Sequence, residues 1–151
     1  MRKILISLLI LRTFGMYAQD LVVKDGIYLN ENGKPYSGDY TSYHHNGDLK
    51  MQCQFNQGKP DGKIMSYYDN GKVELIGHYQ EGLKHGSWVN FNSEGEKVLQ
   101  MSFNKNLRDG LWLMWDETGT LRYEYAYLDG KKYGTWKMWD ESSALVDSQE
   151  H

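Results

Sequence analysis

The sequence predicts an all-β protein, an elongated repeat meander of antiparallel β-hairpins with a 24-residue period in a single twisted sheet. One observation is a run of five glycines that stand 24 residues apart, at Gly38, Gly62, Gly86, Gly110 and Gly134. Another is a second glycine column inside each period, followed by apolar residues that alternate with polar ones. After residue 20, no segment shows the apolar stripe of a helix.

Residues 1–18 are typical of a secretory signal peptide. Arg2 and Lys3 precede the apolar run 4–11, and the small residue Ala18 precedes the expected cleavage point. A short N-terminal helix or a membrane anchor is the alternative, but the run is far shorter than the ~20 residues that span a bilayer. If the segment is cleaved, we expect an exported protein that is periplasmic, secreted or associated with the outer envelope.

Cleavage would also change the charge and so narrow the classes of partner. Loss of Arg2, Lys3 and Arg12 takes the formal net charge from -3 to -6. An acidic product argues against nucleic acid as a partner and weakens attachment to anionic lipid. Cys53 is the only cysteine, so the fold depends on its sheet and on aromatic packing rather than on an internal disulfide.

The remaining chain divides into a cap, a repeat region and a tail. Residues 19–37 are predicted to form an irregular N-terminal cap with a turn at Asn32-Gly33. Residues 140–151 are predicted to form a C-terminal polar tail that faces water. The β-hairpin repeats between them occupy 38–139, as the units 38–61, 62–85, 86–109, 110–133 and a partial unit 134–139.

Within each unit, glycines divide two strands from two turns. The first strand follows the first glycine, and a hairpin turn such as Asn46-Gly47 comes nine residues after that glycine. A second turn follows the return strand, and Asn106 replaces its glycine in one unit. The structural turn glycines of the first two columns are Gly38, Gly47, Gly62, Gly71, Gly86, Gly95, Gly110, Gly119 and Gly134, with Ser143 breaking the second column.

Two columns of bulky residues occupy the first strand of each unit, two and five positions after the first glycine. We call these the second-position and fifth-position columns. They are Tyr40, Ile64, Trp88, Trp112 and Trp136, and Tyr43, Tyr67, Phe91, Trp115 and Trp139. Their opposite parity requires either a β-bulge or aromatic rings on both faces of the sheet. The sequence leaves these two alternatives open.

The return strand is more regular. After the first hairpin turn, Leu49, Met51, Cys53 and Phe55 are apolar and the residues between them are polar, which predicts a strand with one buried face. Neighbouring hairpins then pair as a meander, in which each unit advances the sheet by two strand spacings, roughly 9 to 10 Å.

The aromatic residues are the candidate binding surface. The chain has 5 Trp, 12 Tyr and 4 Phe, more than one face of a single-layer sheet can hide. If rings lie on both faces, one set is partly exposed; otherwise the rings bury one another across strands. The candidate partner-binding residues are Tyr67, Trp88, Trp112, Trp115, Trp136 and Trp139, and the last four form the richest predicted patch.

The sequence indicates no catalytic, cofactor-binding or metal site. His44, His45, His78 and His85 follow no recurring ligand spacing, so solvated turn histidines are expected. Cys53 lies in the buried frame of its strand, which predicts a core residue rather than a nucleophile. Adjacent acidic residues at turns are expected to be solvated, and no glycine-rich segment opens a helix.

Three segments resemble the bacterial MORN-variant repeat, over about residues 33 to 140. They are Asp61-Gly62-Lys63, Tyr67-Tyr68-Asp69-Asn70-Gly71-Lys72 and Tyr79-Gln80-Glu81-Gly82-Leu83-Lys84-His85-Gly86-Ser87-Trp88. Proteins of that family include membrane-associated proteins and antitoxin-like components of toxin pairs, and the related eukaryotic repeats resemble lipid-binding or protein-assembly modules. The substitutions Asn106 and Ser143 put only the local turn geometry in doubt.

The function expected from these observations is a non-enzymatic, exported scaffold that binds a protein or a cell-envelope component through its aromatic-bearing sheet. One alternative is a peripheral, lipid-binding module attached through tryptophans and tyrosines. Carbohydrate binding is a weaker alternative, and an antitoxin-like role is disfavoured by the export signal. The oligomeric state stays open, because an exposed terminal strand could pair with a second copy.

Overall fold

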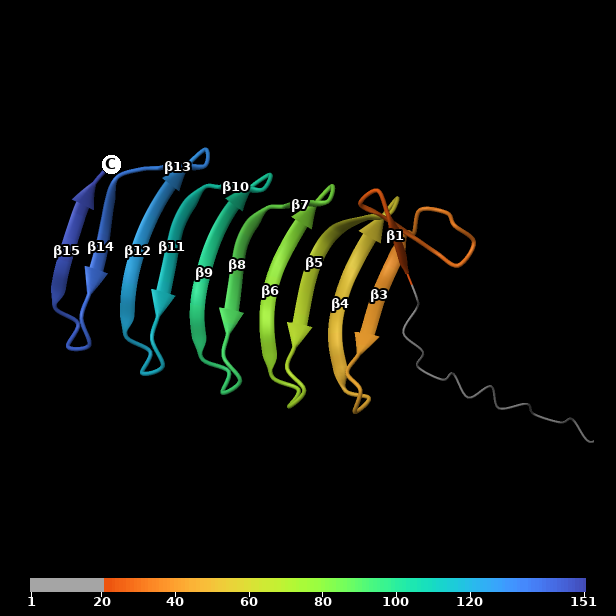
Figure 1. The fold of residues 1–151 in the computed structure, drawn as a ribbon, viewed down its shortest axis with the longest axis horizontal. Coiled ribbons are helices and arrows are strands. Elements are labelled where there is room, and N and C mark those ends of the chain that lie inside the picture. The colour runs from red at the N-terminus through yellow and green to blue at the C-terminus, as the bar shows by residue number, and fades with distance from the viewer. Residues whose placement is uncertain (1–20) are drawn as a thin grey trace, which may run out of the picture.

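The structure is a computed structural model that describes residues 21–151, and it confirms the all-β meander. The predicted signal peptide, 1–18, lies outside the described residues. A two-stranded sheet at the N-terminal end is followed by one thirteen-stranded antiparallel sheet (Figure 1). Hairpins lie side by side in the order of the sequence, so the sheet is an elongated ribbon with a free strand at each end.

Five hairpins build the large sheet. Their leading strands are β3 (Gly38–Tyr43), β5 (Lys59–Tyr67), β8 (Gly86–Phe91), β11 (Gly110–Trp115) and β14 (Thr135–Trp139). Their return strands are β4 (Leu49–Asn56), β6 (Val73–Gln80), β9 (Lys97–Asn104), β12 (Leu121–Leu128) and β15 (Leu145–Glu150). Three two-residue strands precede the last three leading strands, namely β7 (Leu83–Lys84), β10 (Leu107–Arg108) and β13 (Lys131–Lys132).

The C-terminal segment differs from the prediction. Residues 140–151 do not form a tail: they supply the turn and the return strand β15 of a fifth hairpin, with Thr135 opposite Glu150 and Trp139 opposite Leu145. All of β15 is exposed. The sequence concealed this strand because no further hairpin covers it, so its residues need not alternate between apolar and polar.

The N-terminal cap contains the hairpin β1 (Val22–Lys24) and β2 (Ile27–Leu29) and the predicted turn, where Gly33 N–H donates to the Asn30 carbonyl. The cap is attached to the first repeat by backbone hydrogen bonds. Tyr28 N–H donates to the Gly58 carbonyl at 2.8 Å, and Gly58 N–H donates to the Tyr36 carbonyl at 2.7 Å. The cap therefore continues the second-turn pattern of the repeats and covers their first return strand.

A β-bulge interrupts every hairpin just before the fifth-position residue. In the first hairpin Ser42 is opposite Met51 but Tyr43 is opposite Leu49, so Lys50 is the extra residue. The same shift recurs in the other four hairpins, where the extra residues are Glu74, Val98, Arg122 and Val146. The bulge that the sequence left open is thus present, and it lies in the return strand.

The turns keep one geometry throughout. In the first hairpin, His44 N–H donates to the Asp48 carbonyl at 2.7 Å and Gly47 N–H donates to the His44 carbonyl at 2.9 Å; both bonds recur in the other four hairpins. Asn106 and Ser143, which replace glycines, have φ values of 70° and 64°. They adopt the left-handed conformation that the turns require, so the two substitutions leave the turn geometry unchanged.

Side chains at the turns join neighbouring repeats. The Nε2 of His44 lies 2.7 Å from the Tyr67 carbonyl oxygen, and since a carbonyl only accepts, Nε2 carries the hydrogen. Tyr68 makes the equivalent bond one repeat later, from its hydroxyl to the Phe91 carbonyl at 2.8 Å. His44 is therefore not the solvated turn histidine that the sequence predicted, because its ring is half-buried between two turns.

Over the described residues, the structure contains no helix that is long and apolar enough to span a bilayer.

Candidate binding faces

The second-position rings join the aromatic rings of the return strands in one continuous row on one face of the sheet. We call this row the aromatic ladder, and this face the ladder face. Its successive ring centroids are 5.0, 6.3, 5.3, 5.4 and 5.4 Å apart. Its members, in order, are Tyr79, Trp88, Phe103, Trp112, Tyr127 and Trp136. Tilted and edge-to-face contacts of this kind stabilise a sheet across its strands.

Hydrogen bonds fix the orientation of the three ladder indoles. Each Nε1 donates to the carbonyl of the residue ten positions earlier, on the neighbouring return strand. The Nε1 to oxygen distances are 3.2 Å for Trp88 to His78, 3.1 Å for Trp112 to Ser102 and 3.0 Å for Trp136 to Ala126. A buried or half-buried indole N–H needs such a partner, so the ladder is a set of fixed rings rather than mobile ones.

Three cations lie over the ladder, and we call them the cation row: Lys84, Arg108 and Lys132. The Nζ of Lys84 is 4.6 Å from the Trp88 centroid, and the Cζ of Arg108 is 4.7 Å from the Trp112 centroid. Nζ of Lys132 lies 4.2 Å from the Trp136 centroid. These cation–π contacts come from β7, β10 and β13, one in each of three successive repeats.

Burial on the ladder face is incomplete. Only Cys53, Phe55, Trp88 and Tyr127 are buried hydrophobic side chains among residues 21–151. Trp88 is 2% exposed, so the structure places this candidate partner-binding residue in the core. Trp112 and Trp136 are half-buried, beneath Arg108 and Lys132, and the ring centroid of His151 lies 4.6 Å from that of Trp136.

Fifth-position rings lie on the opposite face. The Tyr67 hydroxyl donates to Gln52 Oε1 at 3.2 Å, and Gln52 is directly opposite Met65, two residues before Tyr67 on the same strand. Trp115 lies beneath Lys97, whose Nζ is 4.1 Å from the Trp115 centroid.

The predicted patch of four tryptophans is therefore divided between the two faces. Trp112 and Trp136 belong to the ladder face, whereas Trp115 and Trp139 belong to the opposite face, all four being half-exposed. Of the two alternatives that the sequence left open, both hold. The return strands carry a bulge, and aromatic rings lie on both faces.

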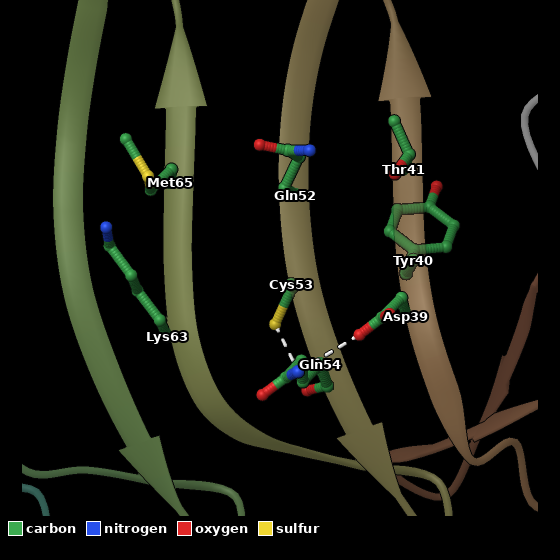
Figure 2. Close-up of a pocket in the computed structure, with 8 residues that line it drawn as sticks. All are labelled: Asp39, Tyr40, Thr41, Gln52, Cys53, Gln54, Lys63 and Met65. Carbon is green, nitrogen blue, oxygen red and sulfur yellow. Dashed lines mark hydrogen bonds between the residues drawn. The ribbon is translucent and has the colours of Figure 1, made fainter.

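A shallow hollow of about 430 Å³ lies over β3, β4 and β5. Figure 2 shows Gln52, Gln54 and Lys63 along it, with Gln54 Nε2 donating to Asp39 Oδ1 at 3.1 Å. Burial raises the pKa of the Cys53 thiol, at the edge of this hollow, to about 11. Cys53 is thus protonated at neutral pH, and its 4% exposure confirms that it is a core residue.

A larger hollow of about 760 Å³ surrounds Trp115 near the first turns of the last two repeats. Arg122 and Asp116 form an ion pair in its wall, with Nη1 and Oδ2 3.2 Å apart. The Thr118 hydroxyl, which donates to Asp116, is the main reason that the pKa of the Asp116 carboxyl falls to about 2. This carboxylate is held as a turn cap and is permanently charged at neutral pH.

The histidines do not form a ligand set. Among residues 21–151, no three side chains of His, Cys, Asp or Glu are close enough together to hold a metal ion. His85 is half-buried, and its Nδ1 has no hydrogen-bond partner.

Comparison with known families identifies the type of repeat. The profile of the MORN repeat variant matches residues 36–57, 60–81 and 108–129. Each match begins two residues before a first-column glycine, Gly38, Gly62 or Gly110, so the matches share the predicted register. A search of curated proteins found no significant match.

Proposed function

The chain belongs to the MORN-variant repeat family, and we propose that it is a non-enzymatic scaffold that binds a protein or cell-envelope partner through its aromatic-bearing sheet. MORN repeats in general occur in scaffolds that bind proteins or membranes. The finer assignment to a protein or envelope partner is our proposal for this chain.

One observation carries the proposal: within residues 21–151 no second layer covers either face of the sheet, and each face presents half-buried aromatic rings. Trp112 and Trp136 supply them on the ladder face, and Trp115 and Trp139 supply them on the opposite face. Aromatic side chains that are fixed in place and only half-buried are favoured at protein interfaces, because they bury a large area at little cost in entropy.

The geometry also favours binding over catalysis. Both hollows described above are open surfaces rather than enclosed clefts. The single thiol is protonated and buried, and Asp116, whose pKa is lowered to about 2, is already engaged by hydrogen bonds within its own turn. Neither residue is available as a nucleophile or as a general base.

Export is a second part of the proposal, and it rests on the signal-like residues 1–18 alone. It predicts that the partner is found in the cell envelope or outside the cell, and it disfavours a cytoplasmic antitoxin. N-terminal sequencing of the protein recovered from fractionated cells tests it. A chain that keeps residues 1–18 and stays in the cytoplasm would contradict export without affecting the binding proposal.

The experiment that tests binding compares the faces. The chain, the pair Trp112→Ala with Trp136→Ala, and the pair Trp115→Ala with Trp139→Ala are used in parallel pull-downs from an envelope extract, with folding checked by circular dichroism. We expect a specific partner to be lost with one folded pair and kept with the other. Capture that neither pair affects, or turnover of a small molecule that one polar substitution abolishes, would contradict the proposal.

Peripheral attachment to a membrane is the second candidate, and the cation row favours it. Lys84, Arg108 and Lys132 lie over the ladder on one face, and two of the tryptophans beneath them, Trp112 and Trp136, are only half-buried, a combination that suits an anionic bilayer surface. Flotation with liposomes of defined composition tests this candidate. If the chain stays at the bottom of the gradient with every composition, the candidate is eliminated.

A further inference from the structure

The two ends of the strands differ in charge. Figure 1 shows the first turns of all five hairpins at one end of the strands, and the second turns with β7, β10 and β13 at the other. The five first-turn segments, 44–48, 68–72, 92–96, 116–120 and 140–144, carry eight acids and one base. The four second-turn segments, 57–61, 81–85, 105–109 and 129–133, carry six bases and four acids. The formal charges of these segments are therefore -7 and +2, so the second-turn segments are positive although the net charge of the chain is negative.

The cation row lies in these second-turn segments, and none of its members forms an ion pair within residues 21–151. The ion pairs found in the described part of the chain are Lys72–Glu94, Arg122–Asp116 and Lys137–Glu124, none of which includes a member of the row. Arg108 and Lys132 are also exposed to solvent. Three positive charges outside any ion pair of the described residues thus lie along the ladder, next to the buried Trp88 and the half-buried Trp112 and Trp136.

The spacing of that line is fixed by the sheet. Successive members of the row are 24 residues apart, which corresponds to one hairpin, or two strand spacings of about 4.8 Å each. The row therefore repeats every ~9.6 Å. A polyproline II helix places every third side chain on the same side, at intervals of about 9.3 Å. An extended β-strand does not fit, because its third residue faces the opposite way.

We propose that the cation row and the aromatic ladder bind an acidic polyproline II segment of a partner protein, with a carboxylate at every third residue. The carboxylates pair with Lys84, Arg108 and Lys132, and the prolines between them lie along the aromatic ladder. Aromatic surfaces of this kind bind proline-rich segments because the ligand is already extended and loses little entropy on binding. This inference rests on the proposed scaffold function and gives the chemistry of its partner.

The side chains of the cation row also cover the aromatic rings. The test therefore distinguishes the loss of their charges from the loss of this cover. The triple variant Lys84→Met, Arg108→Met and Lys132→Met removes three charges but keeps aliphatic chains over the ladder. The matched control is Lys59→Met, Lys105→Met and Lys131→Met. It changes the net charge equally at the same end of the sheet, at exposed residues for which no ring contact is described.

The probe is a synthetic peptide of about twelve residues that repeats Glu-Pro-Pro, so that its acids match the row. An isomer with the same composition and its glutamates adjacent is the control peptide. Binding to the full chain is measured by calorimetry and by tryptophan fluorescence, at low salt and at physiological salt. We expect the row variant to weaken binding of the repeating peptide at least ~10-fold, and the control variant to weaken it less than ~2-fold.

Several results would overturn the inference. One is that the repeating peptide fails to bind, and another is that the clustered isomer binds equally well. A third is that the control variant loses as much affinity for the repeating peptide as the row variant does, which would show a non-specific charge effect. Binding to phosphatidylserine vesicles that depends on the row, without peptide binding, would assign the row to a membrane instead. Self-association that the row variant abolishes would assign it to a second copy. A pull-down partner that depends on Trp115 and Trp139 while the peptide fails would refute this inference and leave the scaffold function standing.

Discussion

Gly77 lies directly beneath the indole of Trp88. A Cβ placed on Gly77 would be 2.5 Å from Trp88 Cδ2 and 2.6 Å from Cε3, closer than any side chain tolerates. Gly77 has an ordinary strand conformation, so its role is to leave space rather than to permit an unusual φ. The most buried ring of the ladder depends on this missing methyl group.

We therefore predict that Gly77→Ala destabilises the protein by about 1–3 kcal/mol, because the added methyl group overpacks a site that is already full. Urea unfolding followed by circular dichroism measures the loss. Trp88→Phe supplies the control, since the smaller ring makes room for the methyl group. In the double variant, the loss of unfolding free energy should be smaller than the sum of the losses in the two single variants. Additive losses would show that the two residues do not share this space.

Stability should fall at alkaline pH through Cys53. Its pKa rises from 9.0 in the unfolded chain to about 11 in the folded protein because the thiol is buried. The folded state therefore keeps a proton that the unfolded state loses, so this contribution, at most about 3 kcal/mol, is complete below pH ~9 and lost as the pH approaches ~11. Urea unfolding at pH values across this range measures it. Cys53→Val isolates the effect from the tyrosines and should flatten the decline; an unchanged slope would contradict the assignment.

Acid should weaken the fourth hairpin through Asp116. Its pKa is lowered to about 2, first by the hydrogen bond from the Thr118 hydroxyl. The resulting stabilisation is present above pH ~4 and is lost as the pH falls toward ~2. Asp116→Asn should lessen this acid sensitivity and keep the turn, because Asn92 caps the equivalent turn with its side-chain oxygen. Thermal unfolding between those pH values compares the two proteins. Glu117→Gln is the neighbouring control, and a variant as acid-sensitive as the parent would refute the prediction.

His44 should contribute by joining the first two repeats. Its Nε2–H donates to the Tyr67 carbonyl, and His44→Ala removes this bond, so we expect a loss of about 1 kcal/mol in the free energy of unfolding. His44→Tyr should recover most of the loss, since Tyr68 makes the same bond one repeat later. Urea unfolding of the unsubstituted protein and of the two variants measures these differences in unfolding free energy. If His44→Tyr is no more stable than His44→Ala, the side chain acts through something other than this bond.

How far the sequence predicts the fold can be seen at the turns. Gly47 and its equivalents require a left-handed conformation that depends only on neighbouring residues, so the 24-residue period was sufficient to locate the first turns of the four full repeats. The return strand from Leu49 to Phe55 likewise shows its alternation within eight residues. Strand β15 was not predicted, because it depends on a neighbouring strand rather than on its own residues. It exists because β14 offers it hydrogen bonds, and its own residues carry little apolar signal.

The candidate binding faces could not be predicted from the sequence, because they depend on contacts between residues of different repeats. Trp112 and Trp115 are three residues apart and equally aromatic, yet one joins the ladder and the other lies beneath Lys97 on the opposite face. From the sequence alone, Arg108 is an ordinary charged turn residue. In the structure, its guanidinium lies over Trp112 and Tyr127.

The sequence by itself determined the all-β repeat architecture, its period and the positions of the turns in its four full repeats, because these follow from the conformations of glycine and from alternation within single strands. Only the tertiary structure decided which rings are core, which are exposed and which cations cover them. The physical reason is that a half-buried ring in a single-layer sheet is defined by the strands on either side of it, and those strands belong to other repeats.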